Sequence, residues 1–130
     1  MYYQKIGLRA DYRRQETQRE KESQSLAERF PELKSLTVKL GFLDGGTANR
    51  TSEIKYSVNI AHARSVFRFN CVNTECVRGD FDLSEQLARA VAERLEIATG
   101  ELRCKGWRSK AAIDRIPCDN LLRFELTLGY

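Results

Sequence analysis

The sequence has 130 residues, of which 42% are hydrophobic and 31% are charged, and its formal net charge is +4. This composition is typical of a soluble globular domain and excludes a disordered or fibrous chain. No run of about 18 apolar residues occurs, so the sequence predicts no membrane-spanning helix and no membrane partner. The mildly basic balance permits contact with nucleic acid without requiring it.

The first ten residues lack the apolar stretch of a signal peptide, so we expect a cytoplasmic protein. Thiols are usually kept reduced in that compartment. The chain has 4 cysteines, and an even set under reducing conditions favours metal binding over disulfide formation.

Residues 8–30 are mostly good helix formers and contain no glycine or proline. Their large apolar side chains after position 8 are few: Tyr12, Leu26 and Phe30. We therefore expect residues 1–30 to form a charged, solvated helical arm, docked only at its C-terminal end and stopped by Pro31.

The remainder, residues 31–130, is expected to be a single domain, in which alternating apolar residues predict strands. A hairpin is predicted from the first two strands, and the third strand either stands alone or continues the second. The five expected strands are residues 36–43, 54–60, 65–71, 101–107 and 121–130.

Between the third and fourth strands, apolar residues recur every four positions and predict an amphipathic helix. Asp82 and Glu85 have the spacing of a capping box, and Gly100 suits the left-handed position after a helix. The stripe is Leu83, Leu87, Val91 and Leu95. The predicted class is α+β: an antiparallel sheet of four to five strands with one packed amphipathic helix, a charged N-terminal helix and a four-cysteine site.

All four cysteines lie in the second half of the chain, at Cys71, Cys76, Cys104 and Cys118. Cys71 and Cys76 have four residues between them, at the upper end of the usual spacing for zinc ligands. Cys104 and Cys118 have 13 residues between them, but they would converge if the fourth and fifth strands form a hairpin. The sequence therefore predicts one structural zinc site, with disulfides or buried core thiols as the alternatives.

Four cysteines at the ends of strands resemble the ligand set of zinc-ribbon-like modules. The segment that contains them covers less than half of the chain, and the gap before Cys118 departs from the paired knuckles of those modules. The resemblance implies a structural metal and nothing about a partner.

The fourth strand carries the best candidate binding surface. If Cys104 points inward, alternation places Arg103, Lys105 and Trp107 on the opposite face, and Arg108 and Lys110 follow. Cations beside an aromatic ring are typical of a nucleic-acid-binding surface. Because acidic residues lie nearby, ordinary solvated charges are the alternative, and a protein partner or a second copy of the chain competes with nucleic acid.

No catalytic constellation is evident. His62 is the only histidine, and a lone histidine in a connecting segment is more often a surface residue than a catalyst. We therefore expect a binding protein and not an enzyme.

Overall fold

The computed structural model describes residues 2–43, 50–71, 76–107 and 117–130. A long helix, α1 (Tyr2–Glu22), precedes a single turn of helix, α2 (Leu26–Arg29). The rest of the chain forms strands and one further helix: β1 (Ser35–Leu43), β2 (Arg50–Ser57), β3 (Arg68–Asn70), β4 (Asp80–Asp82), α3 (Ser84–Ala92), β5 (Ile97–Arg103) and β6 (Leu121–Gly129). None of the described helices is both long enough and apolar enough to cross a bilayer.

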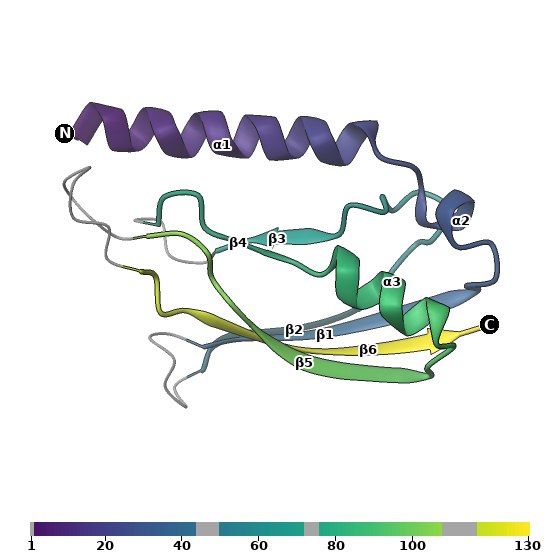
Figure 1. Ribbon diagram of the computed structural model, residues 1–130. Helices are drawn as coiled ribbons and strands as arrows, with labels where there is room; N and C mark the ends of the chain where they lie inside the picture. Colours follow the sequence, from purple (N-terminus) through teal and green to yellow (C-terminus); the bar gives the residue numbers. More distant parts are fainter. Residues whose placement is uncertain (1, 44–49, 72–75, 108–116) are drawn as a thin grey trace.

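A four-stranded antiparallel sheet, in the order β2-β1-β6-β5, forms the base of the fold. Figure 1 shows three layers: this sheet, then α3 with the β3–β4 pair, and then α1 on the outside. Phe81 of β4 packs edge to face on Phe42 of β1, with ring centroids 5.9 Å apart, and joins the two sheets. The predicted α+β class, with an antiparallel sheet and a packed helix, is confirmed.

The central strands follow the predicted alternation. On β1 and β6 one face is buried and the other is exposed or half-buried, as expected for a sheet that covers a core on one side. The buried side chains are Leu36, Val38, Leu40, Phe42, Leu122, Phe124, Leu126 and Leu128.

The edge and short strands differ from the prediction. β2 begins earlier, and Ile54 is 47% exposed although it pairs with buried Leu40, because β2 is the sheet edge. The third strand is short and pairs with β4, which the sequence did not predict, to form a separate two-stranded sheet. A turn, in which the amide of His62 donates to the carbonyl oxygen of Asn59, separates β2 from β3, so the two are not one bent strand.

Helix α3 is shorter than predicted at both ends. Asp82 belongs to β4, and its Oδ1 accepts a bond from the Ser84 amide, while the capping position is occupied by Leu83. The helix ends where Arg94 adopts a positive φ of 50° and the Leu95 amide bonds to the Ala90 carbonyl. This left-handed ending is the one predicted for Gly100, which instead lies within β5.

The N-terminal arm is two helices and not one. Ser25 interrupts it by capping α2, its side chain accepting a bond from the Glu28 amide. The apolar residues of the second segment, Leu26 and Phe30, are buried as predicted. The expectation of docking at the C-terminal end alone is wrong, because the hydroxyl of Tyr12 bonds to Asp80 in the body of the fold. Polar docking of this kind leaves no apolar pattern in a helix.

Candidate metal centre

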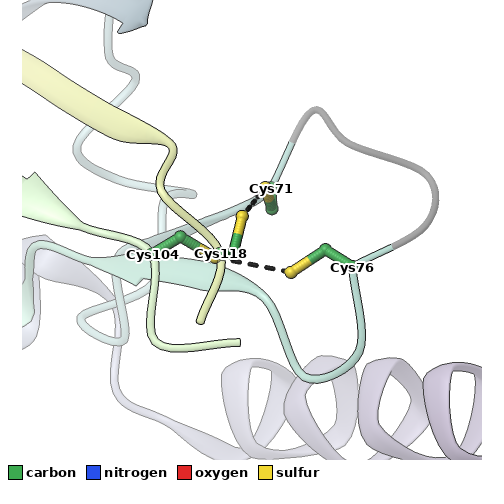
Figure 2. Close-up of side chains that lie close together, drawn as sticks. All are labelled: Cys71, Cys76, Cys104 and Cys118. Atoms are coloured by element: carbon green, nitrogen blue, oxygen red, sulfur yellow. Dashed lines mark hydrogen bonds between the residues drawn. The ribbon is translucent and has the colours of Figure 1, made fainter. Parts of the chain in front are cut away.

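The four cysteines come together at one end of the molecule. Cys71 follows β3, Cys104 follows β5, and Cys118 precedes β6, while Cys76 leads toward β4. Figure 2 shows the four side chains turned toward one another from these separate segments. The convergence of Cys104 and Cys118 follows from antiparallel pairing of β5 with β6, as the sequence analysis expected.

The sulfur positions suit a single metal ion. All four Sγ atoms lie within 4.8 Å of one another, with Cys71 to Cys118 at 3.8 Å and Cys76 to Cys104 at 3.5 Å. Four sulfurs, each about 2.3 Å from one tetrahedral zinc ion, would be about 3.8 Å apart. A disulfide needs about 2.05 Å, and all four cysteines are free. The cluster could therefore hold a metal ion.

Two glycines make room for the sulfur cluster. A Cβ on Gly106 would lie 2.5 Å from both the sulfur of Cys76 and the carbonyl oxygen of Val77. A Cβ on Gly79 would overlap the same sulfur and lie 3.0 Å from that of Cys104. Any larger residue at either position would push the ligand segments apart.

Backbone bonds hold these segments in register. The amide and carbonyl of Val77 exchange bonds with those of Trp107, at 2.9 and 3.1 Å. The amides of Cys104 and Cys118 bond to the carbonyl oxygens of Asn120 and Gly106, both at 2.9 Å. The sulfur positions are thus fixed by the backbone as well as by side-chain packing.

Two N–H groups point at sulfur. The Gly106 amide donates to Cys104 Sγ at 3.5 Å, and the side-chain amide of Asn120 donates to Cys71 Sγ at 3.4 Å. Asn120 is only 2% exposed, so its amide is held at this place. Such donors stabilise negative charge on sulfur, which a metal-bound thiolate carries.

Two of the thiols, those of Cys76 and Cys104, resist ionisation. The hydrogen bond with Cys71 and burial raise the pKa of Cys104 to about 12. Hydrogen bonds with Cys104 and Cys71, followed by burial, raise the pKa of Cys76 further. A cation among the four sulfurs would reverse this balance, because each thiolate would then face a positive charge.

A buried polar cluster beside the cysteines was not predicted. The Asp80 side chain is wholly buried; its Oδ2 accepts bonds from the Tyr12 hydroxyl at 2.7 Å and from Arg68 Nε at 3.0 Å. The ammonium group of Lys105 lies 3.2 Å from its Oδ1. Burial and the bond to Asp80 raise the pKa of Tyr12, which keeps its hydroxyl a donor. Asp80 carried no assignment in the sequence, because nothing in its pattern distinguishes a buried carboxylate from an exposed one.

The strand predicted over residues 101–107 is wrong in its bounds, because β5 begins at Ile97 and ends at Arg103, so Lys105 and Trp107 lie beyond it; the expected inward and outward sides are nevertheless found. Cys104 and Gly106 are buried, while Arg103 and Lys105 have side chains that are 65% and 55% exposed. Trp107 is half-buried. Arg103 lies 3.8 Å from Asp119, so both cations have a carboxylate neighbour. Arg108 and Lys110 fall outside the described residues.

Comparison of the chain with protein-family models, curated proteins and solved structures found no match.

Proposed function

We propose that this protein is a small cytoplasmic binding domain stabilised by one structural zinc ion, held by Cys71, Cys76, Cys104 and Cys118. The supporting observation is the sulfur geometry: four buried thiols lie within 4.8 Å of one another, and two of their separations, 3.8 and 3.5 Å, are close to the edge of a zinc–thiolate tetrahedron. Binding to a site that exists only in the folded chain adds the binding free energy to the stability of the fold.

The choice of zinc follows from the ligands. Four thiolates select soft or borderline metals, and a tetrahedral set of four sulfurs is typical of zinc or iron. A set of four protein ligands leaves no open position for water or substrate, which is the arrangement of structural zinc sites. The proposal therefore includes the absence of catalytic turnover.

Elemental analysis of protein purified under reducing conditions tests the metal and its identity. We expect one zinc per chain, and a melting temperature that falls when a strong chelator removes it. Replacing Cys104 with serine should abolish stoichiometric zinc, whereas replacing exposed Ser57 with alanine, as a control, should not. A metal-free protein whose melting temperature is the same with and without chelator would contradict the proposal. Iron in place of zinc would change the identity of the metal but not the site.

A second proposal concerns the partner. The exposed side chains of Arg103 and Lys105 and the half-buried Trp107 favour nucleic acid, and two more cations, Arg108 and Lys110, follow in the sequence. To bind phosphates, Arg103 must leave the carboxylate of Asp119, and Lys105 must leave that of Asp80. The alternative is a protein partner or a second copy of the chain.

Binding of labelled single- and double-stranded oligonucleotides tests this second proposal. Phosphate contacts release counterions, so affinity should fall steeply with salt, by a log–log slope of about −0.9 per phosphate on duplex DNA. The double substitution Lys105→Ala with Trp107→Ala should weaken binding. If wild type binds neither form better than the roughly micromolar affinity of non-specific contacts, or the double variant binds unchanged, the partner is not nucleic acid at this strand.

A further inference from the structure

The carboxylate of Asp80 lies between the cysteine cluster and helix α1. It bonds to Tyr12 of α1 on one side and to Arg68 of β3 on another, and Lys105 completes its surroundings. The side chains of Asp80 and Arg68 are 0% and 3% exposed. A buried charge of this kind is stable only while all of its partners stay in place.

The cysteine segments determine where these partners sit. Asp80 directly follows Gly79, which packs against the sulfurs, and the Gly79 carbonyl accepts a bond from the Cys71 amide at 3.1 Å. Lys105 lies between Cys104 and Gly106, the residue whose amide bonds to the Cys104 sulfur. Asp80 and Lys105 are therefore each adjacent in sequence to a residue that contacts sulfur. If the cysteine segments move, both side chains move with them.

In residues 11–22, the part of α1 whose side chains the structure describes, the contacts with this cluster are mainly polar. Tyr12 is the only large apolar side chain among residues 11–22, and the guanidinium of Arg78 lies over its ring at 5.9 Å. Further along the helix, Arg19 bonds to Asp82 at 3.1 Å, and Glu20 lies 3.7 Å from Arg68. Polar docking depends on the positions of its partners much more than apolar packing does.

The core of the four-stranded sheet is separate from this contact. In Figure 1, α3 covers the half of the sheet away from the cysteine segments, while α1 lies on the β3–β4 side. The buried cluster that contains Leu87, Val91, Leu126 and Val38 extends to the cysteines and Phe81, but it includes none of residues 11–22, the part of α1 whose side chains the structure describes. Loss of the α1 contact therefore leaves most of the apolar core of the sheet intact.

We propose that metal binding and docking of α1 are thermodynamically linked through Asp80 and Lys105, so that loss of the metal frees α1 while the sheet remains folded. This inference rests on the proposed metal function. Linkage is reciprocal: if the metal favours the docked helix, then the docked helix must raise the affinity for the metal by the same factor.

Hydrogen–deuterium exchange tests the first half of the linkage. We expect amides of residues 11–22 to lose protection when reduced, zinc-loaded protein is treated with chelator, while amides of β1 and β6 keep theirs. Equal protection of α1 with and without zinc would overturn the linkage but not the proposed zinc site. Simultaneous loss of protection in α1 and the sheet would have the same consequence. Failure to bind zinc at all would overturn the proposed function as well.

Substitution of Tyr12 tests the reciprocal half. Tyr12→Phe removes only the hydroxyl that bonds to Asp80, and a hydrogen bond to a charged group is stronger than one between neutral groups. Linkage passes part of the lost docking free energy of α1 to the metal site. We therefore expect zinc affinity, measured by competition with a chelator, to fall by roughly three- to tenfold. Thr17→Val removes a hydroxyl from the exposed face of the same helix and is the control. Equal zinc affinities of the two variants would overturn the linkage.

Discussion

The side-chain amide of Asn120 donates a hydrogen bond to the sulfur of Cys71 across 3.4 Å. Asn120 sits just before β6, and its own carbonyl accepts the Cys104 amide, so one residue supports two of the four cysteines. It therefore helps to orient the cysteine cluster without belonging to it.

Removal of this amide should weaken metal binding. Loss of outer partners of metal ligands typically costs 10–100-fold in affinity, and we expect Asn120→Ala to fall in this range. Chelator competition gives the measurement. Asp119→Ala, at the exposed neighbouring position, is the control and should bind zinc like wild type; an Asn120→Ala variant with wild-type affinity would show that the N–H···S bond is unimportant.

Gly106→Ala should abolish the site. Besides the contact with Cys76 sulfur, the added Cβ would lie 2.7 Å from the Gly79 Cα, and backbone atoms cannot move aside cheaply. We expect loss of stoichiometric zinc and a lower melting temperature. Gly41→Ala is matched in chemistry, but its Cβ would meet nothing nearer than the Arg123 carbonyl oxygen at 4.0 Å, so it should keep the metal. Full zinc content in Gly106→Ala would contradict the geometry.

The pH dependence of stability should reverse when zinc binds. Without metal, the folded chain raises the Cys104 pKa from 9.0 to about 12, so folding favours the neutral thiol. The free energy of unfolding of metal-free protein should therefore fall as pH rises from about 9 toward 12. In zinc-bound protein, protons compete with the metal for thiolates, so stability should fall as pH drops below neutral. Denaturant unfolding with and without zinc checks both signs, and an identical profile for the two forms would contradict the metal centre.

Asp80→Asn should destabilise the fold strongly. It breaks the buried ion pair with Arg68 and leaves this guanidinium only the more distant, partly exposed carboxylate of Glu20; breaking a buried pair typically costs about 3–5 kcal/mol. Asp119→Asn removes an exposed partner of Arg103 and should cost less than about 1 kcal/mol. The free energies of unfolding of the two variants give the comparison. Similar values would mean that Asp80 carries no essential buried charge.

The sequence predicted those parts of the fold in which burial follows a simple period. The alternation of β1 and β6 identified both strands and their buried faces, because each strand covers the core with one side. Convergence of the four cysteines was also predicted, since a hairpin of the last two strands brings Cys104 to Cys118. Strand order was not predicted, because pairing between distant strands leaves no period in the sequence.

The prediction failed where the role of a residue is set by contact with a residue that is distant in the sequence. Gly100 was assigned to a helix end, but a Cβ there would lie 2.7 Å from the Phe124 ring, so the glycine serves strand packing. Arg94 takes the left-handed position instead, with its guanidinium 4.6 Å from the ring centre of Tyr130. The Asp80 cluster was missed for the same reason, because a buried carboxylate and an exposed one look alike in sequence.

X-ray absorption at the zinc edge of protein purified under reducing conditions is the most direct test of the metal centre. If all four cysteines bind the ion, the spectrum will show four sulfur neighbours at about 2.3 Å and no oxygen or nitrogen neighbour. A shell with three or fewer sulfurs and a bound oxygen would contradict a closed structural site, because an open position is the mark of a catalytic zinc.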